Sequence, residues 1–252
     1  MRPTLRRLLG FAAALVLSAA ARAEVVQIAV AANFTEPAKA LAAVFEQTSG
    51  HQARLSFGAT GAFYSQIKNG APFDILLAAD AERPARLDKE GDTVPGSRFT
   101  YAIGQLVLWS AKPGLVDAQG AVLKSGNFNK LSIANPKTAP YGAAAVQSMD
   151  TLGLTAALQP RLVTGESIGQ AYNFIATGNA DLGFVALSQV LQGGGLKSGS
   201  MWRVPGHLHA PIVQDAVILR RAAANPAAKA WVNLLKSAST REFIQGHGYT
   251  VR

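Results

Sequence analysis

Four turns between a predicted strand and a predicted helix carry small polar residues that are suited to holding an anion. The four turns lie at residues 33–35, 58–61, 138–142 and 164–168. Each offers backbone N–H groups at the start of a helix, where the first N–H groups have no partner and the helix dipole is positive. Such ends bind anions. The neutral donors that accompany them are Asn33, Thr60, Tyr141 and an amide near Ile168.

The four turns are poor in cations. The first, second and fourth contain neither Lys nor Arg, and Lys137 lies next to the third. Sites for an ordinary carboxylate or phosphate often use a bidentate Arg, whereas dipoles and hydroxyls suit a small symmetrical oxyanion. Roughly six donors at ~1.5–3 kcal/mol each give a gross ~9–18 kcal/mol. Association and ordering consume roughly 4–15 kcal/mol, so an affinity in the micromolar range or tighter is plausible.

A purely structural interpretation exists for each of these residues. Asn, Thr, Ser and Gly are the residues that any α/β fold uses to cap helices and make turns. Taken singly, each is better explained as a cap than as a ligand. Only the set of four favours a binding site.

The first turn shows how a strand and a helix would position a donor. Residues 25–32 form an apolar run typical of a buried strand. The stripe of Ala38, Leu41, Ala42 and Phe45 predicts an amphipathic helix after it. Between them, Asn33 is expected to be the N-cap, with Glu36 three residues on as in a capping box.

The order of elements predicts two α/β lobes. Strands at 53–57 and 73–79 enclose a second helix and extend the first strand into a parallel sheet. Longer apolar segments at 99–110 and 211–219 are expected to cross between lobes, with a cleft between them. We therefore predict lobe 1 at 24–105, lobe 2 at 106–213 and a return to lobe 1 at 214–252.

The N-terminus has the pattern of an export signal. Arg2, Arg6 and Arg7 precede an apolar segment at 8–20, and Ala21-Arg22-Ala23 is a small-residue cleavage site. We predict a signal peptide at 1–23 and a mature chain that starts at Glu24. The chain has no cysteine, so acylation, disulfides and thiolate metal sites are excluded. A soluble periplasmic protein is expected.

The net charge of +9 overstates how basic the mature protein is. Four arginines lie in the signal, which leaves 20 basic and 15 acidic residues, a net +5. These basic residues form no run. A nucleic-acid partner is therefore not supported.

In several segments the chain resembles the periplasmic molybdate-binding proteins of ABC transporters, in register over the whole mature sequence. The resemblance implies a two-lobed type II periplasmic binding fold that captures molybdate or tungstate between its lobes, without a cofactor, and delivers it as a monomer to a membrane permease. The segments are Ala31-Ala32-Asn33-Phe34, Ser56-Phe57-Gly58-Ala59-Thr60-Gly61, Gly70-Ala71-Pro72-Phe73-Asp74-Ile75, Asn135-Pro136 with Pro140-Tyr141-Gly142, and Gly246-His247-Gly248-Tyr249-Thr250-Val251.

The resemblance also assigns ligand residues. The family's positions for binding molybdate, and so its molybdenum, fall on Asn33, Thr60, Tyr141 and Ile168, with Ile168 acting through its backbone N–H. Some members have Ser at the first two positions and a tyrosine where this chain has Ala186. The hydroxyl is here expected from Tyr141, as in another branch of the family.

Three alternatives stay open at this stage. Sulfate resembles molybdate in charge and shape, so a receptor for another oxyanion is one. Gly165-Glu166-Ser167-Ile168-Gly169 matches the nucleophile motif of serine hydrolases, with Asp181 or Asp215 and His247 as partners. His207 and His209 could bind a metal, although no third ligand follows at a useful spacing and an exposed loop pair explains them better.

Overall fold

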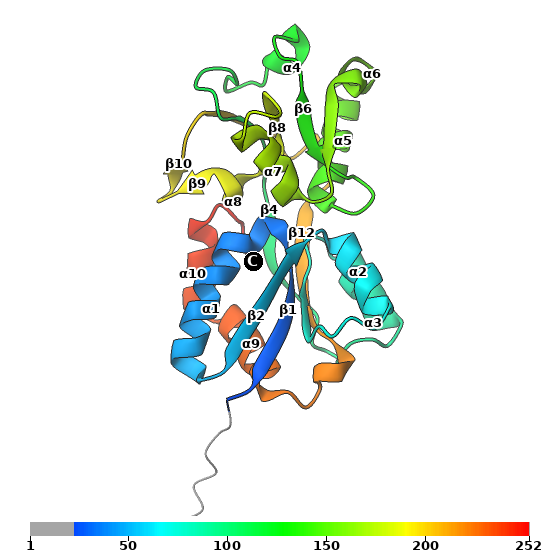
Figure 1. The fold of residues 1–252 in the computed structure, drawn as a ribbon, viewed down its shortest axis with the longest axis vertical. Helices are drawn as coiled ribbons and strands as arrows, with labels where there is room; N and C mark the ends of the chain where they lie inside the picture. Colours follow the sequence, from blue (N-terminus) through cyan, green and yellow to red (C-terminus); the bar gives the residue numbers. More distant parts are fainter. Residues whose placement is uncertain (1–22, 252) are drawn as a thin grey trace, which may run out of the picture.

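Two five-stranded sheets organise the chain into two lobes (Figure 1). The computed structural model describes residues 23–251. The first sheet has the order β2 (Gln52–Gly58), β1 (Val25–Ala31), β3 (Ile75–Leu77), β12 (Ile212–Ile218) and β4 (Phe99–Gly104). The second has the order β11 (Ser200–Arg203), β5 (Leu106–Ser110), β8 (Leu182–Ala186), β6 (Leu131–Ala134) and β7 (Leu162–Gly165).

Each sheet is mixed. In the first lobe β1 runs parallel to β2 and β3, while β12 is antiparallel to β3 and β4. In the second lobe β6 runs parallel to β7 and β8, while β5 is antiparallel to β8 and β11. The parallel strands place the starts of their following helices at the sheet edges that face the other lobe, as Figure 1 shows.

Helices cover both sheets. Those of the first lobe are α1 (Thr35–Ser49), α2 (Thr60–Lys68), α3 (Glu82–Lys89), α9 (Pro226–Lys236) and α10 (Ala238–Gly246). Those of the second lobe are α4 (Val122–Ser125), α5 (Pro140–Thr151), α6 (Thr155–Leu158), α7 (Ile168–Ala176) and α8 (Leu187–Val190). A small hairpin, β9 (Leu191–Gln192) and β10 (Gly195–Leu196), follows α8, and short 3-10 turns are η1 (Ala32–Phe34), η2 (Gln159–Arg161) and η3 (Arg220–Ala222).

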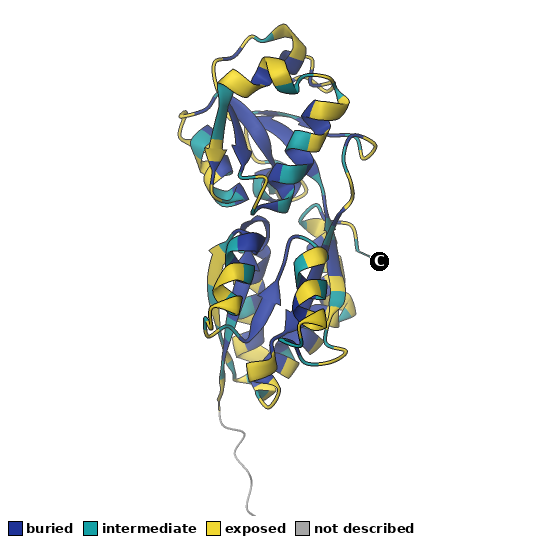
Figure 2. Cartoon of the chain, turned by 90° about the vertical axis from the view of Figure 1, so that its right-hand side faces the viewer, coloured by how far each residue is buried: buried dark blue, intermediate teal, exposed yellow. Residues whose placement is uncertain are grey.

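Aromatic pairs anchor the core of the first lobe. Phe34 meets Tyr101 edge-to-face with ring centroids 5.0 Å apart, and Phe45 meets Trp231 at 5.2 Å. The core of the second lobe extends to small side chains of the first, Ala31, Ala32, Ala59 and Ala79. Figure 2 shows that buried residues fill the sheets and also the loops where the lobes meet.

The predicted capping box at the first turn is wrong. Helix α1 begins at Thr35, its N-cap residue is Phe34, and no side-chain cap bond is made there. Asn33 instead lies in η1 with its side chain buried, and Glu36 pairs with Lys39. Tertiary hydrogen bonds that a local pattern does not reveal compete successfully for the Asn33 amide.

The crossing segments differ in detail from the prediction. The expected single strand at 99–110 is two strands, because β4 ends at Gly104 in the first sheet and β5 starts at Leu106 in the second. The chain returns to the first sheet with β12, which begins at Ile212. The predicted lobe limits at 105/106 and 213/214 stay predictions.

Two helical details were also missed. The expected helix at 227–245 is α9 and α10, separated at Ser237, whose hydroxyl accepts the Thr240 N–H and caps α10. Helix α3 was not expected, because only Pro84 and Leu87 of its residues are buried and most of its other residues are charged.

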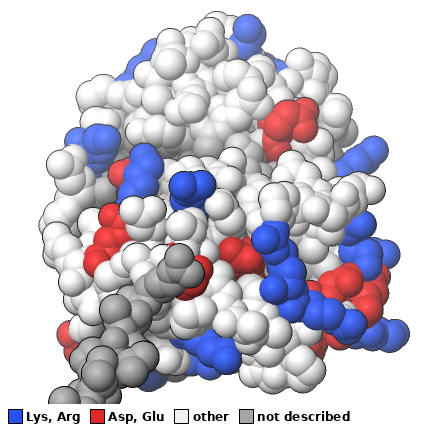
Figure 3. All heavy atoms as spheres, turned by 60° about the horizontal axis from the view of Figure 1, so that its bottom comes forward, with Lys and Arg blue, Asp and Glu red and all other residues white. Residues whose placement is uncertain are grey.

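None of the helices in residues 23–251 has the length and apolar composition that a membrane span requires. The predicted signal segment lies outside the described residues, apart from its last residue. On the face shown in Figure 3, acidic and basic side chains are interspersed, in keeping with the modest charge expected for the mature chain.

Candidate functional site

The four residues predicted from the turns line one small buried pocket between the lobes. Asn33 and Thr60 come from the first lobe, and Tyr141 and Ile168 from the second; their exposed fractions are 2, 1, 1 and 4%. The pocket is small, with a cavity volume of about 10 Å³. The rest of its wall is small or apolar: Ala31, Ala32, Gly58, Ala59, Ala79, Ala139 and Pro140.

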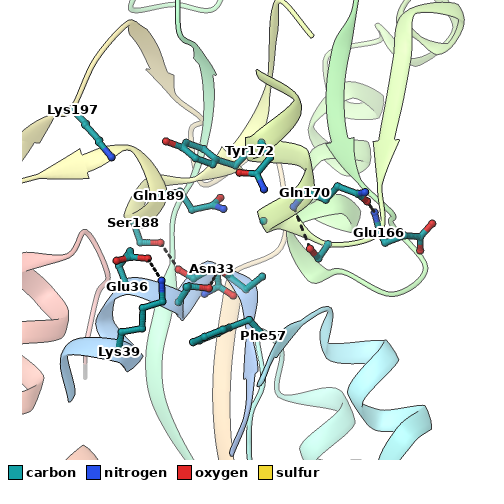
Figure 4. A pocket seen from close by; sticks show the side chains of 15 residues that line it. Asn33, Glu36, Lys39, Phe57, Glu166, Gln170, Tyr172, Ser188, Gln189 and Lys197 are labelled. Carbon is teal, nitrogen blue, oxygen red and sulfur yellow. Dashed lines mark hydrogen bonds and ion pairs between the residues drawn. The ribbon is translucent and has the colours of Figure 1, made fainter. Parts of the chain in front are cut away.

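No Lys or Arg is among these described wall residues. The charged groups lie in the wider outer cleft, whose lining residues, Asn33 among them, are drawn in Figure 4. There Glu36 and Lys39 come from the first lobe, and Glu166 and Lys197 from the second. An anion in the inner pocket would therefore be held by dipoles rather than by a counter-charge.

The hydroxyl of Thr60 is oriented by the backbone. Its oxygen accepts the N–H of Ala79 at 2.9 Å, just after β3. Within the described chain its hydrogen makes no hydrogen bond to a protein acceptor. Because a hydroxyl has one hydrogen, Thr60 can donate it to a ligand in the pocket.

The hydroxyl of Tyr141, like that of Thr60, accepts a hydrogen bond from the protein. Tyr141 is the second residue of α5, and its hydroxyl oxygen accepts Nε2 of Gln214 at 3.1 Å. Burial raises the pKa of Tyr141 well above its ordinary value, so the phenol stays neutral and keeps its hydrogen. The hydroxyl is again a potential donor to the pocket.

The amide of Asn33 is more constrained than the sequence suggested. Its Nδ2 donates to Oε1 of Gln214 at 2.9 Å and to the hydroxyl of Tyr249 at 3.1 Å, which engages both of its hydrogens. Its Oδ1 is buried and has no hydrogen-bond partner among the described residues. A direct side-chain bond from Asn33 to a ligand stays a prediction.

The backbone of Asn33 also joins the lobes. Its carbonyl oxygen accepts the hydroxyls of Ser188, which lies on α8 of the second lobe, and of Tyr249, both at 2.8 Å. Burial also raises the pKa of Tyr249. These contacts fix the turn after β1 against the second lobe.

Ile168 is the first residue of α7, where backbone N–H groups have no intrahelical partner. Ser167 is the N-cap, and its hydroxyl accepts the Gln170 N–H at 3.3 Å. A Cβ on Gly169 would lie 3.3 Å from the Ala32 side chain, so a glycine lets this helix end approach the first lobe closely. The side chain of Ile168 is apolar, and only its N–H can serve an anion.

The lobes touch beside the pocket. The N–H of Gly61, at the start of α2, donates to the Thr138 carbonyl at 2.8 Å. Nη2 of Arg83 donates to the Lys137 carbonyl at 2.9 Å while its Nη1 pairs with Asp80. This is the arrangement of a closed cleft, in which donors from both lobes surround one point.

The serine hydrolase interpretation is wrong. The partner of the Ser167 hydroxyl is its own helix, through the cap bond to Gln170. Asp215 is bound by Arg98 and Thr100, and Asp181 by Lys112 and two backbone N–H groups. His247 lies against the Phe243 carbonyl of α10. The three members of the predicted triad are engaged in separate structural contacts.

The histidine pair gives no metal site. His209 lies in an exposed loop with Nδ1 2.8 Å from the Ala210 carbonyl. In the part of the chain that the structure describes, no group of three His, Cys, Asp or Glu side chains is placed to hold an ion.

Several residues behind the pocket were missed from the sequence. Gln214 lies in the middle of a strand, Tyr101 in another, and neither has a local signal. Tyr249 belongs to a segment that carried the family resemblance, but it was given no role. Their part in the site depends on tertiary contacts alone.

The buried tyrosines predict how stability depends on pH. Burial raises the pKa of Tyr101, Tyr141 and Tyr249. In the unfolded chain phenols ionise near pH 10, so the free energy of unfolding should be unaffected below about pH 9 and should fall as the pH rises further. Ultraviolet titration should show these three of the five tyrosines ionising only together with unfolding. Five phenolates appearing while circular dichroism stays native would contradict their burial.

Comparison with known proteins agrees with this geometry. Residues 26–250 match the family model of the bacterial extracellular solute-binding proteins. The Molybdate-binding protein ModA of Azotobacter vinelandii is 61% identical over 246 residues, covering 98% of both chains. The ModA of Rhodobacter capsulatus is 54% identical, covering 91% of this chain and 89% of the other.

The solved structure of the Azotobacter vinelandii periplasmic molybdate-binding protein superposes with a TM-score of 0.87 and 43% identity, covering 90% of this chain and 99% of that one. The two-lobed periplasmic binding fold predicted from the sequence is thus confirmed. The family is one of binding proteins and not of enzymes. This chain belongs to the bacterial extracellular solute-binding proteins, in the branch of the ModA proteins.

Proposed function

We propose that the protein captures molybdate, and also tungstate, in the pocket between its lobes. The observation that carries the proposal is the polarity of the pocket: two buried hydroxyls accept hydrogen bonds from the protein and keep their hydrogens for a ligand. The relatives at 61% and 54% identity are named for molybdate. A fully deprotonated tetrahedral dianion accepts from every direction, which matches a pocket that offers donors on several sides.

In this proposal Thr60 and Tyr141 donate through their hydroxyls, and Ile168 donates through its backbone N–H. Asn33, the second residue of η1, completes the ring of contacts. The donors come from both lobes, so the ligand favours closure over the open form by its differential contacts. Closure excludes water, which strengthens each charge-assisted hydrogen bond.

Sulfate is the second candidate ligand, because it has the same charge and shape at a smaller size. Nothing in the polarity of the donors discriminates between the two ions. The close relatives named for molybdate favour the larger one.

We further propose that the protein is a monomer in the periplasm and delivers its ligand to the permease of an ABC importer. Membership of the extracellular solute-binding family supports export, and the sequence supports a signal at 1–23. N-terminal sequencing of the protein from a periplasmic extract should give Glu24 as the first residue. Recovery of the intact Met1 terminus would contradict cleavage.

If Tyr141 donates to the ligand, removing its hydroxyl should weaken molybdate binding while the shape of the pocket stays the same. Tyr141→Phe removes one hydroxyl, and a lost bond to a charged acceptor should weaken molybdate binding roughly ten- to hundredfold. Calorimetry of the purified protein measures it. Tyr172→Phe is the matched control, because Tyr172 lines the outer cleft and stacks on Trp109. Equal affinities of the two variants would remove Tyr141 from the ligand contacts.

A further inference from the structure

One buried side chain touches a predicted ligand residue from each lobe. Gln214 lies on β12 of the first sheet and is fully buried. Its Nε2 donates to the hydroxyl of Tyr141 at 3.1 Å, and its Oε1 accepts Nδ2 of Asn33 at 2.9 Å. Tyr141 belongs to the second lobe and Asn33 to the first, so the bond to Tyr141 spans the cleft behind the pocket.

The contacts of Gln214 determine which way its amide faces. Oε1 meets the Asn33 NH₂ group and also lies 3.0 Å from the hydroxyl of Tyr101, which shares its one hydrogen with the Ala78 carbonyl at 3.0 Å. With its oxygen on this side, the amide presents NH₂ to Tyr141. An NH₂ group of an amide only donates, so the Tyr141 oxygen must accept and its hydrogen must point elsewhere.

With the Gln214 amide reversed, the hydrogen of Tyr141 would no longer be free for a ligand. If the amides of Gln214 and Asn33 were both reversed, the Gln214 oxygen would take the Tyr141 hydrogen. The Asn33 NH₂ would then occupy the place of its Oδ1, which is buried and has no partner among the described residues. Reversing only Asn33 would set two oxygens against each other, and reversing only Gln214 would set two NH₂ groups against each other. In the observed orientation Gln214 engages the oxygen of Tyr141 and leaves its hydrogen free for a ligand in the pocket.

The backbone at Gly104 makes room for this contact. Gly104 ends β4 and pairs with Ile212 of β12. A Cβ at this position would lie 2.0 Å from the hydroxyl oxygen of Tyr141 and 2.5 Å from Nε2 of Gln214. Only glycine lets the strand lie this close to the pair, so the strand that crosses between the lobes forms the back wall of the Tyr141–Gln214 bond.

We propose that Gln214 is the positioning residue of the oxyanion site. It holds the Tyr141 hydroxyl as an acceptor from behind, which directs the phenol hydrogen to the bound anion, and its Oε1 accepts the Asn33 side-chain amide. This role rests on the proposed function, because it requires an anion in the pocket. Gln214 itself does not line the pocket and acts through Tyr141.

A double-mutant cycle with molybdate calorimetry tests the role. Gln214→Met keeps the length of the side chain and removes both polar ends. It should weaken molybdate binding about tenfold when Tyr141 is present and less than about twofold in the Tyr141→Phe background, since the hydroxyl that it positions is then absent. Thr100→Val is the matched control, because it removes a bond between β4 and Asp215 of β12 away from the pocket and should leave the affinity unchanged.

A second variant keeps the polar shape in case Gln214→Met folds poorly. A buried Glu has a raised pKa and is protonated more readily than an exposed one. Gln214→Glu should bind molybdate weakly at about pH 8 and recover at about pH 6, where the protonated carboxyl can again donate to Tyr141. In the Tyr141→Phe background the recovery should be several-fold smaller, because only relief of charge repulsion remains.

The outcomes separate this role from others. Equal losses for Gln214→Met with and without the Tyr141 hydroxyl would overturn it and assign Gln214 to Asn33 or to the fold. A lowered melting temperature with unchanged affinity would overturn it as well. If the unsubstituted protein failed to bind molybdate, the proposed function would be contradicted, whatever the cycle gave.

Discussion

A dianion buried without a counter-cation requires every polar group that faces it to be a hydrogen-bond donor. Burying an unpaired charge is otherwise prohibitive, since desolvation far exceeds the energy of one hydrogen bond. Backbone N–H groups meet this requirement by nature. A hydroxyl meets it when no other acceptor takes its hydrogen, and a protein donor bound to its oxygen keeps that hydrogen free. The N–H of Ala79 does this for Thr60, and the amide of Gln214 does it for Tyr141. The site therefore depends on groups that never touch the ligand.

The architecture follows from the same requirement. Donors must converge from several directions, and one sheet edge supplies only one direction. Two α/β lobes that face each other supply helix starts from both sides, and small residues let them approach. A Cβ on Gly61 would lie 2.9 Å from the Cα of Thr138, and one on Gly169 would lie 3.3 Å from the Ala32 side chain. The alanines that line the pocket act similarly, because they fill the wall without adding polar atoms.

Much of this could be read from the sequence, because apolar runs that stop at small polar residues are a local signal. Thr60 and Tyr141 were found as residues at helix starts, and the order of strands and helices predicted both lobes. The predictions that failed concern side chains whose hydrogen-bond partners are distant along the sequence. Asn33 looked like a helix cap but its amide is engaged by Gln214 and Tyr249. Gln214 and Gly104 lie inside ordinary strands, and nothing in their neighbours along the chain reveals that they meet Tyr141.

The central claim is that the hydroxyls of Thr60 and Tyr141 act as donors to the ligand, and competition between oxyanions tests it most directly. At about pH 8 molybdate carries no hydrogen, whereas phosphate keeps one, which would meet a donor instead of an acceptor and leave both unpaired. Molybdate binding to the unsubstituted protein is measured by calorimetry with excess phosphate and then with excess sulfate. Phosphate tests how a proton on the anion affects binding, and sulfate tests how the size of the anion affects it. The account predicts tight molybdate binding that phosphate does not displace. Displacement of molybdate by phosphate at comparable concentration would contradict it.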